Sequence, residues 1–147
     1  MTEARPSLTE KTAAIAWARA WNTRNLELLR PLIHRKSYIT DQRRWDPRRD
    51  LKDYLQRLQD LFDHLPSEHL GAAMELAETP SPGFIGDPPR PCVIEYRRRR
   101  PYASILFRVH AGLIRQVEIR LLPPPSECSL SGIYPGIEES LDLAEVN

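Results

Sequence analysis

The 147-residue chain has the length of one domain, and 41% of its residues are hydrophobic, so it is not disordered as a whole and needs no metal or disulfide to fold. No apolar run approaches the roughly 18–20 residues of a membrane-spanning helix, and the mixed charges of residues 1–6 exclude a signal peptide. We therefore expect a cytoplasmic protein without a membrane segment.

The net charge of +1 is divided unevenly along the chain. Residues 1–122 carry a net charge of +6, and residues 123–147, which contain no basic side chain, carry −5. This division predicts a folded domain over residues 1–122 and a proline-rich, then acidic, tail over residues 123–147 that is either solvated or folded over the basic body. Cys92 and Cys128 have no metal-ligand spacing, and we expect neither a metal, nor a cofactor, nor a disulfide in a reducing compartment.

The N-terminal third predicts two helices. Ser7 or Thr9 is a suitable N-cap, and Trp17 and Trp21 recur at helical spacing within an alanine-rich stretch that ends at residues 22–25. A second, short helix is expected over residues 26–32, with Pro31 near its end.

The middle of the chain predicts a strand, a charged loop and an amphipathic helix. Residues 37–42 alternate β-branched and aromatic side chains, as a strand does, and residues 43–49 form the loop. From about residue 50, with Asp50 as N-cap, a helix to residue 65 is indicated by the apolar stripe Leu51, Tyr54, Leu55, Leu58, Leu61, Phe62 and Leu65.

The second half of the chain is β in character. Residues 68–79 are ambiguous between strand and helix, and residues 79–91 form a proline-rich loop. Strands follow at residues 92–99, 102–109 and 113–122, with a tight hairpin at residues 110–112.

This order of elements resembles the nuclear transport factor 2-like (NTF2-like) superfamily, which includes SnoaL-like and steroid-isomerase-like proteins. The resemblance covers roughly residues 7–122 and is carried by the segment Trp17-Ala-Arg-Ala-Trp-Asn22, residues 26–33, Tyr38-Ile-Thr-Asp41, residues 51–65 and the hairpin over residues 110–120. It implies an α+β, cone-shaped, cystatin-like domain in which N-terminal helices pack on a curved antiparallel sheet. The superfamily includes isomerases, dehydratases, polyketide cyclases and transport adaptors, and a shared fold does not fix the chemistry.

Asp41 is the candidate catalytic residue. It stands nine residues after Leu32, where steroid-isomerase-like members have a general-base aspartate at the end of the first strand, and a carboxylate at a pocket mouth can move protons. The alternative is an aspartate paired with Arg43 or Arg44. The remaining residues of that isomerase site are missing, since Trp17 stands where the tyrosine would be and the strand over residues 102–109 offers only Ser104 as a polar candidate.

The expected ligand is a small apolar molecule in the cone, and its predicted binding residues are Trp17, Tyr38, Trp45 and Tyr54. Tyr38 and Asp41 are three positions apart, so a regular strand directs their side chains to opposite faces, and they share a cavity only if the strand twists or bulges between them. The histidines have no metal-ligand spacing, and the arginine runs over residues 43–49 and 97–100 favour solvated charges over nucleic-acid binding.

A twofold homodimer is predicted through the mixed face of the last strands, with Tyr102, Leu106 and Ile114 exposed on a monomer. The function that we expect is small-molecule binding with cyclase-like activity as one option. The alternative is a non-catalytic interaction module.

Overall fold

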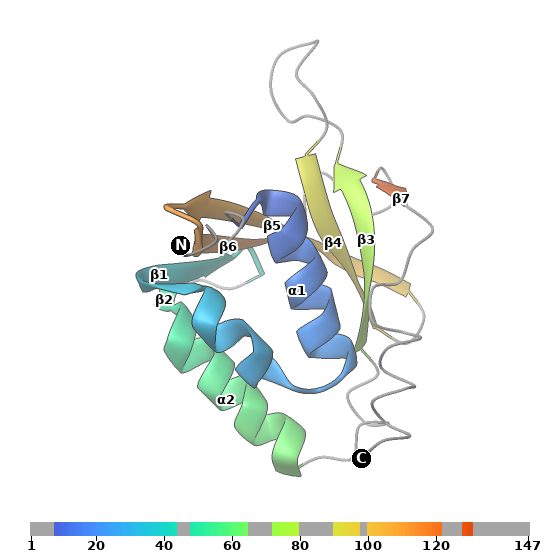
Figure 1. The fold of residues 1–147 in the computed structure, drawn as a ribbon. Coiled ribbons are helices and arrows are strands. Elements are labelled where there is room, and N and C mark those ends of the chain that lie inside the picture. Colours follow the sequence, from blue (N-terminus) through green and yellow to red (C-terminus); the bar gives the residue numbers. More distant parts are fainter. Residues whose placement is uncertain are drawn as a thin grey trace.

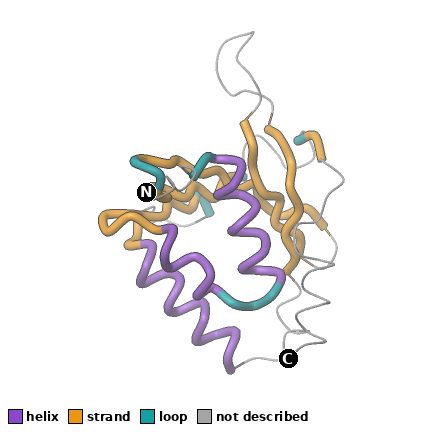
Figure 2. Tube along the Cα trace, in the orientation of Figure 1, coloured by secondary structure: helices purple, strands orange, loops and turns teal. Residues whose placement is uncertain are grey.

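The computed structural model of the chain describes residues 8–43, 48–64, 72–79, 90–97, 100–121 and 128–130. Within these residues the elements follow in the order α1 (Glu10–Asn22), the 3₁₀ helix η1 (Leu26–Leu32), β1 (Ile33–Asp41), β2 (Arg48–Asp50), α2 (Leu51–His64), β3 (Ala72–Thr79), β4 (Arg90–Arg97), β5 (Arg100–His110), β6 (Leu113–Arg120) and β7 (Ser129–Leu130). The helices gather on one side of a curved sheet, with α1 lying across β3 to β5 and α2 beside β1 and β2 (Figures 1 and 2). The predicted α+β class, with N-terminal helices on a curved sheet, is confirmed.

The first helix begins at a threonine cap. The Thr9 hydroxyl accepts a hydrogen bond from the Thr12 backbone N–H at 3.1 Å, and the Thr12 hydroxyl accepts one from the Thr9 N–H at 2.8 Å, so both donors are satisfied at the open end of α1. At the other end the Thr23 hydroxyl donates to the Arg19 carbonyl. The helix buries four alanines together with Trp17 and Trp21, and its small residues let it lie close to the sheet.

The second predicted helix is a 3₁₀ helix. A period of three residues places Leu26, Leu29 and Leu32 on one edge, of which the first two are buried, while Leu28 remains exposed. Pro31 lies inside this helix and has no N–H to continue an α-helical ladder.

The amphipathic stripe of α2 is buried over most of its length. The Asp50 carboxylate caps the helix by accepting from the Asp53 N–H at 3.1 Å, as predicted. Leu51, Leu55 and Phe62 are buried in the core. The predicted burial of Leu61 is wrong, because this residue is exposed at the edge of that face. Leu65 lies outside the described residues.

The described strands form one sheet in the order β2-β1-β6-β5-β4-β3-β7. Its neighbours pair antiparallel except β1 and β6, which run parallel, so the predicted antiparallel sheet is in fact mixed. β2 lies within the segment predicted as a charged loop, and the ambiguous segment before residue 80 contains β3. The hairpin between β5 and β6 turns at Ala111 and Gly112, which both have positive φ (52° and 75°), as a type I′ turn requires.

Buried side chains line both faces of the sheet. The larger core lies between the helices and the concave face, and a smaller cluster on the outer face contains Ala77, Cys92, Ile94, Leu106 and Cys128. The predicted exposure of Leu106 and Ile114 is therefore wrong: Leu106 belongs to the outer cluster and Ile114 to the main core, and only Tyr102 of the three is exposed. A homodimer stays a prediction, but these two residues do not supply its surface.

Part of the predicted tail belongs to the sheet. Ser129 and Leu130 pair with Glu78 and Ala77 of β3, and Cys128 is buried. In the described portion of the chain, no helix is both long enough and apolar enough to cross a membrane.

Candidate functional site

Asp41 lies at the end of β1 on the concave face, because its register partner on β6 is the core residue Ile119. Arg43 holds its carboxylate in a bidentate ion pair, with Nε 2.7 Å from Oδ1 and Nη2 2.7 Å from Oδ2. The Arg43 backbone N–H also donates to Oδ1 at 3.0 Å. Of the two alternatives for this residue, the structure shows the ion pair, but in a buried position and not on the surface.

A second buried carboxylate continues this network. Glu95 on β4 faces the same side as its direct partners Met74 and Ala103, which are both core residues. Its Oε2 lies 2.7 Å from the Arg97 Nε and 3.5 Å from the Arg43 Nη1. We call these four charged residues, together with Tyr102, the charged cluster.

Tyr102 completes the charged cluster by lying against both guanidinium groups. The Arg43 and Arg97 Cζ atoms are 5.0 Å and 4.3 Å from its ring centroid. A register shift between β4 and β5 at Glu95 and Tyr96 inserts Tyr102 as an extra residue, and such a bulge redirects a side chain locally.

The charges of the cluster neutralise one another. Burial by itself would lower the pKa of the Arg43 guanidinium, but the hydrogen bonds to Asp41 and the nearby Glu95 carboxylate outweigh it and raise the pKa above its ordinary value. The Asp41 oxygens already accept two guanidinium N–H groups and one backbone N–H. To accept a proton from a substrate, Asp41 would first have to leave this pair.

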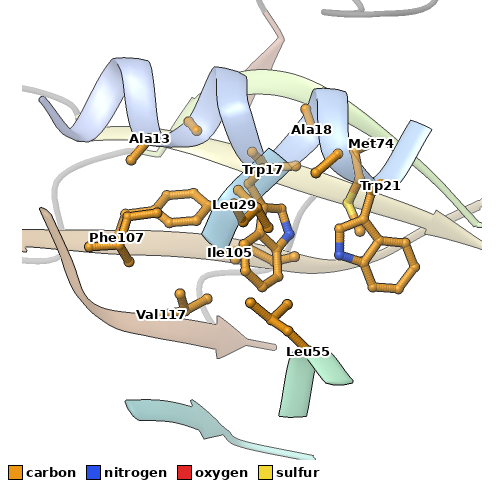
Figure 3. Close-up of a cluster of buried hydrophobic side chains, with 14 of the residues drawn as sticks. Ala13, Trp17, Ala18, Trp21, Leu29, Leu55, Met74, Ile105, Phe107 and Val117 are labelled. Atoms are coloured by element: carbon orange, nitrogen blue, oxygen red, sulfur yellow. The ribbon is translucent and has the colours of Figure 1, made fainter. Parts of the chain in front are cut away.

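The interior of the cone presents two indole donors. Trp17 and Trp21 lie one helical turn apart on the buried face of α1, and Figure 3 shows their indole nitrogens on the facing edges of the two rings. Neither Nε1 has a hydrogen-bond partner among the described residues, although both side chains are buried. An unpaired buried donor costs about 1–3 kcal/mol. These two N–H groups are therefore suited to a bound acceptor.

The walls around the indoles are apolar. The Phe107 ring meets Trp17 edge to face with a centroid distance of 5.7 Å, and Phe62 meets Trp21 at 5.1 Å. Leu55 lies beside the gap between the two indoles (Figure 3). A molecule held there would be surrounded by hydrocarbon and two N–H donors.

A groove of about 350 Å³ lies between η1 and α2, and neither Trp17 nor Trp21 is among its lining residues. Its floor consists of Leu26, Ile33 and Leu55, which belong to the same core as Trp17 and Trp21. Gln59 closes one end, because its Oε1 accepts from the Leu26 N–H at 2.9 Å. The rim is polar and is formed by Glu27, Arg30, Lys52, Asp53, Gln56 and Gln59.

The predicted site residues are only partly brought together. Tyr38 lies on the opposite face from Asp41, because the register shift of β1 falls between residues 33 and 38 and leaves the alternation from 38 to 41 intact. The Arg48 guanidinium covers the Tyr38 ring, with its Cζ 4.0 Å from the ring centroid. Tyr54 lines a separate groove of about 270 Å³ on the outside of α2. Trp45 lies outside the described residues. Of the three that are described, Trp17 is buried in the core, and Tyr54 is half-buried and packs against that core.

Three residues of this region were not predicted as site residues. Glu95 could have been found as an acid inside an otherwise apolar strand segment, on the same face as Val93. Trp21 could have been paired with Trp17 by its i, i+4 spacing. Nothing in the sequence marks Leu55 as a site residue, because a groove between two helices depends on how they pack.

Ser104, the polar candidate on β5, lies on the outer face, where its hydroxyl donates to the Arg120 carbonyl. Among the described residues no group of acids, histidines or cysteines is placed to hold a metal ion.

Comparison with known proteins identifies the fold. No family model matches the sequence, and no curated protein does. An NTF2-like protein of unknown function from Cytophaga hutchinsonii superposes with a TM-score of 0.54 over 84% of this chain and 98% of its own, at 12% identity. The fold is NTF2-like.

Two further structures have a similar extent but lower scores. A cystatin-like protein of unknown function from Methylobium petroleophilum covers 87% of this chain and 90% of its own, with 10% identity and a TM-score of 0.49. IdmH from Streptomyces antibioticus, a candidate polyketide cyclase, covers 91% and 99%, with 18% identity and a TM-score of 0.44. The fold assignment therefore depends on the Cytophaga protein, and at 12% identity that likeness leaves the chemistry to the residues of the site.

Proposed function

We propose that this chain is a small-molecule-binding protein that holds a mostly apolar ligand in the cone, with an acceptor oxygen of the ligand bound by the indole N–H groups of Trp17 and Trp21. The observation that carries the proposal is the pair of buried, facing indole donors without a partner among the described residues. A carbonyl oxygen has two lone pairs and can accept from both.

The surroundings define the class of ligand. Leu55, Phe107 and Ile105 are buried hydrocarbon around the indoles. The Arg24 guanidinium beside Trp21 lies against the Phe62 ring and donates to the Trp21 carbonyl, so transferring a carboxylate into the hydrocarbon would be costly. A neutral carbonyl of a ketone, ester or amide avoids this cost and can still accept hydrogen bonds from the two indole N–H groups. The groove between η1 and α2 has a volume of about 350 Å³, within the roughly 300–1,000 Å³ of ligand sites. Because neither tryptophan lines it, a ligand that reaches the indoles from this groove has to displace core side chains, Leu55 among them.

The charged cluster supports a binding role over proton-transfer catalysis. Two facing N–H donors resemble an oxyanion site, but such a site catalyses a reaction only together with a group that moves the proton. Asp41 is the predicted base, and its oxygens are engaged by Arg43. In the charged cluster each carboxylate is paired with an arginine. We therefore assign the cluster a structural role at the end of the concave face.

The alternative of an interaction module has less support. It relied on the outer face of the sheet, where Ile94 and Leu106 are already covered within the chain, and on the arginine clusters. In those clusters Arg43 and Arg97 form ion pairs with the buried carboxylates of Asp41 and Glu95. We therefore do not assign that face to a partner.

The proposal is tested by comparing carbonyl compounds with hydrocarbons of the same shape, for example cyclic and aryl ketones with the corresponding alkylarenes. Calorimetric titration should give the ketones at least about fivefold tighter binding, because each hydrogen bond is worth about 1 kcal/mol. Trp17→Phe and Trp21→Phe should each reduce this preference while the affinity for the hydrocarbon stays similar.

Phe107→Leu is the matched control, because it removes an aromatic contact of Trp17 and leaves both donors in place. It should keep the preference for ketones. The proposal is wrong if ketones and hydrocarbons bind equally well to the unmodified chain, or if the preference survives the replacement of both tryptophans.

A further inference from the structure

The two cysteines of the chain lie together on the outer face of the sheet. Cys92 on β4 is fully buried, and Cys128, directly before β7, is nearly so. Both belong to the apolar cluster that also contains Ala77, Ile94 and Leu106. Neither residue has a place in the ligand site proposed above, which lies on the opposite face.

The topology explains how residues 36 positions apart meet. Ala77 of β3 pairs with Cys92 on one side and with Leu130 of β7 on the other. The Ala77 side chain is a single methyl group, and Cys92 and Cys128 belong to the same buried cluster as Ala77. The Cys92 and Cys128 thiols are within hydrogen-bond contact, and burial first, then this neighbouring thiol, raises the pKa of Cys92.

We propose that Cys92 and Cys128 form a redox pair that a hydroperoxide closes into a disulfide, which fixes β7 covalently to β4. Cys128, the less buried thiol, attacks the peroxide as its thiolate and becomes a sulfenic acid, and one water is released from hydrogen peroxide. The Cys92 sulfur then displaces the hydroxyl of the sulfenic acid, and a second water leaves. The two thiols lose two electrons and two protons, and hydrogen peroxide is reduced to two water molecules.

Burial controls the rate of this reaction. The raised pKa of Cys92 makes its thiolate scarce, so the second step is slow, and the pair suits sustained oxidation better than rapid signalling. The product joins two strands on either side of β3 and closes a loop of 36 residues. Restricting the unfolded chain in this way should raise the melting temperature by roughly 8–15 °C.

The test uses the full chain, which contains only these two cysteines. After treatment with hydrogen peroxide, intact mass under non-reducing conditions should be lower by about 2 Da, should return with dithiothreitol, and should coincide with the higher melting temperature. Cys92→Ala and Cys128→Ala should each prevent both changes, and either variant that folds suffices for the control.

Three outcomes would overturn the proposal. In the first, both thiols still react with iodoacetamide after peroxide treatment and unfolding. In the second, oxidation produces a disulfide between two chains in place of the internal one. In the third, the internal disulfide forms but lowers the melting temperature, which would mean that the folded sheet does not accommodate it.

Discussion

The buried ion pair between Asp41 and Arg43 gives the sharpest stability prediction. The exposed fractions of the two side chains are 9% and 15%, so water screens the pair little. Two unit charges about 4 Å apart attract by about 4 kcal/mol at an effective dielectric constant of 20. Asp41→Asn removes this attraction but keeps an oxygen for the Arg43 N–H, and Glu95 still faces Arg43. We expect a loss of about 2–4 kcal/mol in the free energy of unfolding.

Glu27 and Arg30 provide the matched control, because their ion pair has nearly the same distance, 2.8 Å, with exposed fractions of 57% and 68%. Glu27→Gln should cost less than about 1 kcal/mol. Urea denaturation of both variants measures the difference directly. If Asp41→Asn is as mild as Glu27→Gln, the pair contributes little to folding, and Asp41 would again be available for a catalytic role.

Four further substitutions test how the fold is assembled. Asn22→Ala should cost about 2–4 kcal/mol in urea denaturation, because its side chain both donates to the Met74 carbonyl at 3.1 Å and accepts from the Met74 N–H at 2.9 Å; an unchanged stability would contradict this. Leu51→Asp should prevent cooperative melting, and Leu58→Asp, at a half-buried position, should cost clearly less; equal effects would show that the two positions are equally buried. Ala111→Gly should raise the melting temperature, because it relieves a positive φ of 52° at a cost of about 1–2 kcal/mol; a lower melting temperature would refute the turn geometry.

The elements that could be predicted are those with a strong period. The amphipathic stripe of α2 depends on a single face packing against the core, and the sequence displays it directly. Along β5 the alternation identifies the face that joins the main core, with Ala103, Ile105 and Phe107, although the opposite face is buried as well. The parallel pairing of β1 with β6 and the three-residue strand β2 could not be predicted in the same way. The first joins strands that are distant in sequence, and the second is too short to show an alternation, so neither leaves a side-chain pattern of its own.

The sequence predicts where Asp41 lies, but it does not predict whether its carboxylate is available for proton transfer. Its place at the end of the first strand follows from the spacing after Leu32, and Arg43 is one of the two arginines that the sequence offers as its partner. The burial of this pair and its link to Glu95 depend on the packing of distant strands. For the indoles of Trp17 and Trp21, too, the sequence predicts the position but not the chemistry. Their helical spacing predicts a shared face, but the direction of each N–H is decided by ring packing against Phe107 and Phe62.

The central claim is that the two indole N–H groups bind a carbonyl oxygen, and ¹⁵N–¹H NMR of the tryptophan side chains measures this directly. The chain has three tryptophans, so single substitutions to phenylalanine assign each indole signal. On saturation with a ketone whose binding has been measured by calorimetry, the Trp17 and Trp21 signals should move downfield together, as expected for donors that gain an acceptor. If the ketone binds and both signals stay where they are in the unliganded protein, the ligand does not use these donors and the account of the site is wrong.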